Sequence, residues 1–195
     1  MERSVVLAGF GGQGILFAGE ALARAGLAQG MEVLWLPSYG PEMRGGTANC
    51  TVIAAAEPIG SPVVDHIDAA IVLNPPSLAR FLPLVAHDGL VIVNDSLIEA
   101  AVERADVRVL RIRCTALARE AGGERLTSVV ALGALVAAMG TFHAEAVQAA
   151  LCAMVERKHP ELIEGNLQAF EAGRRAVFDP GTVPVPAPAA RPGRA

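Results

Sequence analysis

Short apolar runs alternate with amphipathic stretches along most of this chain, and this alternation predicts an α/β fold. Residues 4–8 form a β-branched, apolar run that ends at a glycine, as a buried strand does. Residues 13–28 carry apolar side chains at helical spacing and are followed by Gly30, which is placed to stop a helix. Residues 32–36 predict a second strand. This order of elements opens a Rossmann-like, doubly wound fold, with a mostly parallel sheet and helices on both faces.

The pattern continues through the chain and becomes helical in the last third. Further strands are expected at residues 48–55, 68–73, 90–93 and 107–112, and the last of these alternates with arginine as an edge strand or a half-exposed strand does. Helices are expected at residues 77–85, 97–104, 115–121, 126–139, 144–158 and 160–177. Thr141 is the expected N-cap of the helix at 144–158. Residues 180–195 hold five prolines, so we expect one domain over residues 1–179 and a disordered Pro/Ala-rich tail.

Composition and charge narrow the class of protein. The 195 residues suit one domain, and 52% hydrophobic with 18% charged residues indicates a globular protein. The net charge is −4 and the basic residues are scattered, which argues against a nucleic-acid partner. No apolar run reaches eighteen residues, and the N-terminus does not resemble a secretory signal. We therefore expect a cytoplasmic protein without a membrane span.

The cysteines and histidines do not form metal-binding patterns. Cys50, Cys114 and Cys152 lie far apart and include no CxxC pair, which argues against an iron–sulfur cluster or zinc site carried by this chain alone. The four histidines are dispersed, so no metal ligand is expected. No serine or cysteine lies in a nucleophile motif, and no catalytic residue is assigned.

A glycine turn follows the first predicted strand. Gly9, Gly11 and Gly14 satisfy G-x-G-x-x-G between a strand and a helix, and Gly12 and Gln13 lie inside the turn. Such a turn lets a phosphate approach the free N–H groups of the helix N-terminus. Close helix–sheet packing is the alternative explanation for the glycines, and Gln13 either bonds a ligand or caps the loop. We favour an anion site, which requires a cavity beside residues 9–14.

The turn lacks the partner that NAD binding requires. A dinucleotide site places a carboxylate at the end of the second strand, about twenty residues on, to hold the ribose. Here that strand ends Leu34-Trp35-Leu36-Pro37, and Glu32 lies at its opposite end. The sequence therefore argues against ordinary NAD binding.

Residues 37–47 are expected to form a loop in which Arg44 precedes Gly45 and Gly46. A guanidinium there could clamp a carboxylate or phosphate in bidentate fashion, or pair with Glu42 on the surface. Asn94-Asp95-Ser96 follows another strand, where ligands also collect, although a helix N-cap is the preferred interpretation. The candidate ligand-binding residues are Gly9, Gly11, Gly12, Gln13, Gly14, Arg44, Gly45 and Gly46.

These loops carry a family resemblance. Residues 9–14 and 37–50 resemble the gamma subunit of 2-oxoacid:ferredoxin oxidoreductases, and so do residues 59–64 and 94–98. The similarity runs from about residue 5 to 177. The arginine loop looks more like the 2-oxoglutarate and branched-chain 2-oxoacid branches than the pyruvate branch. Ser128 departs from the family, which usually has asparagine there, and a ligand or subunit contact at that position is therefore in doubt.

The resemblance implies a multisubunit enzyme that converts a 2-oxoacid, coenzyme A and an oxidised carrier into an acyl-CoA, carbon dioxide and a reduced carrier. It implies that thiamine diphosphate, Mg and iron–sulfur clusters lie on partner subunits, and that the isolated chain is inactive. The implied partners are thiamine-binding alpha and beta subunits, with a ferredoxin-like delta subunit as a further candidate and ferredoxin as acceptor. Coenzyme A is a candidate shared ligand, because its pyrophosphate suits the glycine turn. The alternatives are an indolepyruvate:ferredoxin oxidoreductase small subunit and a stand-alone nucleotide-binding Rossmann protein.

Overall fold

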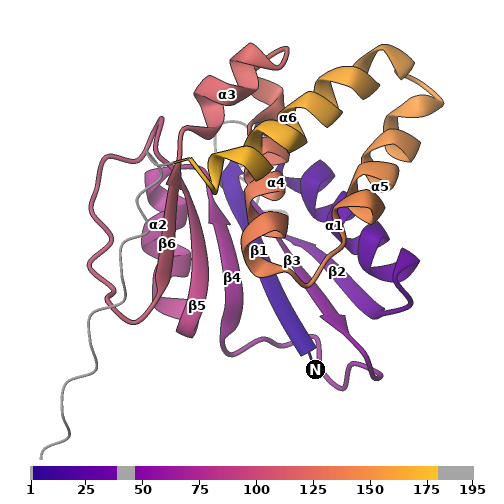
Figure 1. The fold of residues 1–195 in the computed structure, drawn as a ribbon. Coiled ribbons are helices and arrows are strands. Elements are labelled where there is room, and N and C mark those ends of the chain that lie inside the picture. The colour runs from indigo at the N-terminus through magenta and orange to yellow at the C-terminus, as the bar shows by residue number, and fades with distance from the viewer. Residues whose placement is uncertain (1, 39–46, 180–195) are drawn as a thin grey trace, which may run out of the picture.

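The computed structural model describes residues 2–38 and 47–179, and its centre is a six-stranded sheet in the order β2-β3-β1-β4-β5-β6 (Figure 1). The strands are β1 (Glu2–Phe10), β2 (Glu32–Ser38), β3 (Thr47–Ala55), β4 (Ile67–Val72), β5 (Val85–Asn94) and β6 (Arg108–Ile112). The helices are α1 (Ile15–Ala28), α2 (Pro75–Phe81), α3 (Cys114–Glu120), α4 (Thr127–Met139), α5 (Ala144–Glu156) and α6 (Ile163–Ala176). Short 3₁₀ turns are η1 (Leu82–Leu84), η2 (Glu124–Leu126) and η3 (Pro160–Leu162). The predicted tail at 180–195 lies outside the described residues.

The predicted α/β class with a mostly parallel sheet is confirmed, but the order of its first strands is not that of a simple doubly wound sheet. β1, β4, β5 and β6 pair in parallel, whereas β3 is antiparallel to both β1 and β2. Only eight residues separate β2 from β3, and a parallel neighbour needs a crossover of about a dozen or more residues. The chain therefore returns antiparallel, and β3 lies between β1 and β2. The predicted edge strand, β6, is at the sheet edge.

Helices cover the two faces of the sheet unequally. On one face α1 and α4 pack against the strands and bury alternate strand residues such as Val5 and Leu7, and α3, α5 and α6 pack against these two helices (Figure 1). The opposite face buries Val6 and Ala8 under α2 and the segment 95–106. Strands buried on both faces read as continuous apolar runs, which is why the sequence pattern located them. No helix of the described residues is long and apolar enough to cross a membrane.

Helices α4 and α6 cross with their backbones in close contact. An ideal Cβ on Gly133 would lie 2.0 Å from the carbonyl oxygen of Phe170, and one on Gly173 would lie 1.8 Å from that of Val130. Real side chains do not approach at such distances, so the two glycines permit the crossing. The crossing fixes α4, whose N-terminal turn lies against the glycine turn described below.

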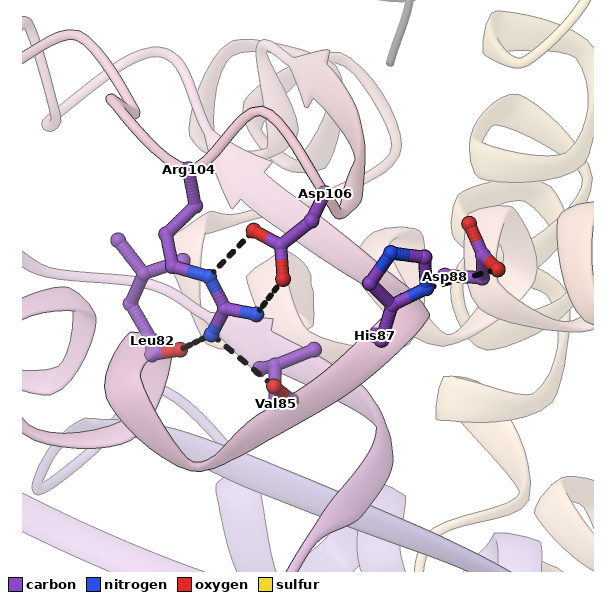
Figure 2. A network of polar contacts seen from close by, with 6 residues as sticks. All are labelled: Leu82, Val85, His87, Asp88, Arg104 and Asp106. Atoms are coloured by element: carbon purple, nitrogen blue, oxygen red, sulfur yellow. Dashed lines mark hydrogen bonds and ion pairs between the residues drawn. The ribbon is translucent and has the colours of Figure 1, made fainter. Parts of the chain in front are cut away.

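The predicted helix at residues 97–104 is wrong, because this segment is a turn followed by an irregular connection. Arg111 donates to the carbonyl oxygens of Ile98 and Ala100, two acceptors that a helix would use internally. Arg104 pairs with the Asp106 carboxylate, and its Nη1 donates to two distant carbonyl oxygens, those of Leu82 and Val85, each at 3.0 Å (Figure 2). Long-range contacts of arginine side chains thus replace the local hydrogen bonds of a helix.

The expected N-cap at Thr141 is also wrong. Helix α5 begins at Ala144 with His143 as its N-cap, and the side chain of His143 makes no capping bond. Instead Gln29, just after α1, accepts a hydrogen bond from the His143 N–H at 2.6 Å and donates to the Thr141 carbonyl oxygen at 3.3 Å. A side chain more than a hundred residues away in sequence therefore organises the start of α5.

Candidate functional site: the glycine turn

The glycine turn and the exit of the arginine loop lie side by side. The antiparallel register of β1 and β3 places Phe10 opposite Thr47 and Gly9 opposite Ala48. A cavity of about 300 Å³ opens at this point, which is the carboxyl end of β1. It is lined by Phe10, Gly11, Gly12, Gly14, Ile15, Leu16, Phe17, Thr47 and Ala48. The cavity that an anion site requires beside residues 9–14 is present.

Gln13 closes the turn on itself. The backbone N–H of Gln13 donates to the Phe10 carbonyl oxygen at 3.2 Å, and the Phe10 N–H donates to Gln13 Oε1 at 2.7 Å. Of the two roles open to Gln13 in the sequence, the structure shows the loop cap. The glutamine side chain thus stabilises the closed conformation of the turn.

The glycines of the turn serve different purposes. Gly9 is buried, and an ideal Cβ there would lie 2.5 Å from Gln13 Oε1. Gly14 has a φ of +78°, and its ideal Cβ would lie 2.6 Å from Ser128 Oγ and 2.9 Å from the Arg125 carbonyl oxygen. Gly12 has a φ of +92° and is exposed, and none of the atoms that the structure describes lies within 4 Å of an ideal Cβ there. Close packing therefore explains Gly9 and Gly14, and the left-handed backbone also requires glycine at 12 and 14.

The first turn of α1 lines this cavity. Gly14 is the N-cap and provides no side-chain bond, and the first turn has no acidic residue. Within the described residues, no acceptor is recorded for the N–H groups of Ile15, Leu16 and Phe17. Free N–H groups and the helix dipole favour a negatively charged group at this end.

The remaining wall is apolar. Phe10 is 38% exposed, and Leu16 and Phe17 are partly exposed on the first turn of α1. No charged side chain is among the described lining residues. An anion in this cavity would therefore meet backbone N–H groups, and an apolar part of the same ligand would have a surface to cover. The structure describes neither Arg44 nor Gly45 and Gly46, so their ligand contact stays a prediction.

Asn94, the first residue of the Asn94-Asp95-Ser96 motif, has a structural role. Asn94 is fully buried, and its Nδ2 donates to the Leu73 carbonyl oxygen at 3.3 Å and to Thr115 Oγ1 at 2.9 Å. The side chain thereby ties β4 and β5 to the start of α3. The preferred N-cap interpretation of Asp95 and Ser96 is wrong, because no helix follows them. Asp95 instead pairs with Arg111, and Ser96 Oγ accepts from the Ala116 N–H of α3 at 3.3 Å.

Two of the three cysteines, Cys50 and Cys114, are buried. Burial raises the pKa of the Cys50 thiol to about 11, and burial also raises the pKa of Cys114 above its usual range. Both thiols are therefore protonated at neutral pH and poor nucleophiles. Within residues 2–38 and 47–179, no three His, Cys, Asp or Glu side chains gather as a metal-ligand group.

Sequence reasoning missed several residues of this site. The apolar wall residues Phe10, Leu16 and Phe17 were not candidates, although an exposed phenylalanine inside a glycine turn is a signal that could have identified the first. Thr47 and Ala48 could not be found, because only the antiparallel register of β3 brings them beside the turn.

The comparisons with known proteins agree with the family resemblance seen in the sequence. The family model described as pyruvate ferredoxin/flavodoxin oxidoreductase matches residues 4–176. Ketoisovalerate oxidoreductase subunit VorA of Methanothermobacter thermautotrophicus is 39% identical over 173 residues, covering 88% of this chain and 36% of VorA. 2-Oxoglutarate synthase subunit KorC of the same organism is 33% identical over 186 residues, covering 92% of this chain and 97% of KorC.

A solved structure of a gamma subunit is also similar to this chain. The gamma subunit of a keto/oxoacid ferredoxin oxidoreductase from Geobacter sulfurreducens superposes with a TM-score of 0.80 at 26% identity, covering 91% of this chain and 97% of that one. The chain thus spans about a third of VorA and nearly the whole of the smaller relatives. It belongs to the pyruvate ferredoxin/flavodoxin oxidoreductase family, in which it corresponds to the gamma subunit of 2-oxoacid:ferredoxin oxidoreductases.

Proposed function

We propose that this chain is the gamma subunit of a cytoplasmic, thiamine-diphosphate-dependent enzyme that oxidatively decarboxylates 2-oxoglutarate or a branched-chain 2-oxoacid to an acyl-CoA. Two relatives support this choice of substrates, since one is named for ketoisovalerate and the other for 2-oxoglutarate. Thiamine-binding alpha and beta subunits would hold thiamine diphosphate and Mg²⁺, and the partners would carry the iron–sulfur clusters. Ferredoxin would accept the electrons.

Within that complex, this chain assists coenzyme A binding and closes over the catalytic subunits. The observation that carries the proposal is one cavity that combines an apolar wall with three N–H groups at the start of α1 that have no acceptor among the described residues. Coenzyme A joins a pyrophosphate to a long aliphatic arm. The pyrophosphate would accept from the N–H groups of residues 15–17, and the arm would cover Phe10 and Phe17. The residues present therefore fit this ligand through backbone amides and apolar contact.

The test is reconstitution of the complex with its thiamine-binding subunits. The isolated chain should show no turnover, and the complex should reduce ferredoxin when given coenzyme A and either 2-oxoglutarate or ketoisovalerate. Preference for indolepyruvate over both would move the enzyme to the indolepyruvate branch. NAD reduction by the isolated chain would refute the proposal in favour of a stand-alone nucleotide-binding protein.

Arg44 is tested in the same assay. Arg44→Ala should raise the KM for coenzyme A while the chain remains folded, because a guanidinium beside the turn would pair with the pyrophosphate. Arg24→Ala is the matched control, since Arg24 is an exposed arginine of α1 that pairs with Glu20. Equal KM values for the two variants would remove Arg44 from coenzyme A binding.

A further inference from the structure

The hydroxyl of Ser128 lies beside the glycine turn. Ser128 is the second residue of α4 and is completely buried, and its Oγ has no hydrogen-bond partner within residues 2–38 and 47–179. An ideal Cβ on Gly14 would lie 2.6 Å from this oxygen. A buried hydroxyl that lacks a partner destabilises a folded protein, so its presence beside a ligand cavity calls for a physical explanation.

The turn stands between this hydroxyl and the cavity. Gly14 lines the cavity, and the side of its backbone where a side chain would lie faces Ser128. A peptide unit carries its N–H and C=O on opposite sides. When N–H groups of the turn face an anion in the cavity, carbonyl oxygens of the same peptides therefore face toward α4. The hydroxyl of Ser128 is an unpartnered donor on that side.

The turn has room to make this adjustment. Gly12 is exposed, and no atom of the described residues lies within 4 Å of an ideal Cβ at this position, so the backbone has space on that side. The inner part has little space, since an ideal Cβ on Gly14 would lie 2.6 Å from Ser128 Oγ and 2.9 Å from the Arg125 carbonyl oxygen. A small rotation of the Gln13–Gly14 peptide would thus change which group faces Ser128, without moving α4 and without breaking the bond from the Gln13 N–H to the Phe10 carbonyl oxygen.

We propose that Ser128 is a positioning residue for the glycine turn: its hydroxyl donates to a carbonyl oxygen of the Gln13–Gly14 segment when an anion is bound. This bond holds the opposite N–H groups toward the cavity. The inference rests on the proposed function, because it takes the pyrophosphate of coenzyme A as the anion. It predicts that Ser128 contributes to affinity and not to the stability of the free protein.

The adjacent residue offers a matched control. Thr127 is also fully buried, and its hydroxyl already donates to the Glu124 carbonyl oxygen at 2.6 Å. Removing that hydroxyl breaks an existing bond, whereas removing the Ser128 hydroxyl breaks none. Ser128→Ala and Thr127→Val should therefore separate a role in binding from a role in folding.

The experiment titrates the full-length chain with coenzyme A, and separately with inorganic pyrophosphate, while the amide resonances of residues 11–17 are followed by NMR. Ser128→Ala should weaken binding by about two- to tenfold, the range of one neutral hydrogen bond. Its melting temperature should stay unchanged or rise, because an unpartnered buried group has been removed. Thr127→Val should lower the melting temperature and leave the affinity unchanged.

The outcomes that overturn the inference differ from those that overturn the proposed function. Equal affinity of Ser128→Ala and the wild-type chain would overturn the inference alone. A parallel loss of affinity and stability in Ser128→Ala would show an ordinary structural role and also overturn it. If neither probe shifts the resonances of residues 11–17 in the wild-type chain, the proposed ligand itself is wrong and the inference fails with it.

Discussion

Gly14 should be far less tolerant of a side chain than Gly12, although both have a positive φ. Alanine in a left-handed conformation costs about 1–2 kcal/mol, and this strain applies to both positions. At Gly14 the new Cβ would also lie 2.9 Å from the Arg125 carbonyl oxygen and 2.6 Å from Ser128 Oγ, whereas Gly12 is open. Forcing a group into such a packed position costs about 1–3 kcal/mol more.

We therefore expect Gly12→Ala to lose about 1–2 kcal/mol of unfolding free energy and Gly14→Ala about 2–5 kcal/mol. For a chain of this size each kcal/mol lowers the melting temperature by about 2–4 °C. Urea unfolding and thermal melting of the full-length variants measure the difference. Adding Ser128→Ala to Gly14→Ala should recover only part of the loss, because the Arg125 carbonyl oxygen belongs to the backbone and stays in place.

Equal losses in the two single variants would refute this reasoning. That result would mean that α4 does not contact Gly14 in solution, and the packing explanation of this glycine would fall. It would also remove the geometric basis for coupling Ser128 to the turn.

Three further predictions concern the pH response, the thiols and the helix crossing. The Arg104 guanidinium lowers the pKa of Asp106 to about 2. The ionised Asp106 carboxylate therefore stabilises the fold above its ordinary pKa, and this stabilisation is lost as the pH falls toward 2. NMR titration of the Asp106 carboxyl group should show the low midpoint, and Arg104→Gln should return that midpoint toward about 4. A thiol reagent at neutral pH should modify the partly exposed Cys152 in the native protein and reach the buried Cys50 only after unfolding, and equally fast reaction of both would contradict the burial of Cys50. Gly133→Ala should destabilise the protein by more than Gly12→Ala, because α4 and α6 must separate to admit the methyl group, and a smaller loss in chemical denaturation would count against the close crossing.

Local patterns located most of the elements in the sequence. Apolar runs marked the strands because those strands are buried on both faces, and helical spacing with Gly30 marked α1, which ends at Ala28. The glycine turn was recognisable because the backbone conformation of the turn itself requires glycines, as the positive φ values of Gly12 and Gly14 show. These features depend on residues that are close together in the chain, which is why one sequence sufficed to find them.

The features that escaped prediction depend on distant residues. Nothing in residues 47–55 indicates that this strand enters the sheet between β1 and β2, since the same apolar run would suit any central strand. The segment 97–104 has helical composition, but Arg111 takes the carbonyl oxygens of Ile98 and Ala100 from outside it. In the same way, the apolar cavity wall and the unpartnered Ser128 emerge only when α1, β3 and α4 meet.

The position of β3 gives a structural reason for the missing ribose carboxylate. In a dinucleotide-binding sheet, the strand after the first helix lies beside β1, and an acidic residue at its carboxyl end reaches the ribose. Here β2 lies two strands away, about 10 Å from β1, so a carboxylate at Ser38 would be displaced by that distance. The place beside Phe10 is taken by the neutral Thr47, at the amino end of an antiparallel strand. In the proposed coenzyme A site, the glycine turn would therefore supply the anion-binding half of a dinucleotide site without the ribose-binding half, which would suit a ligand recognised through its pyrophosphate and an apolar arm.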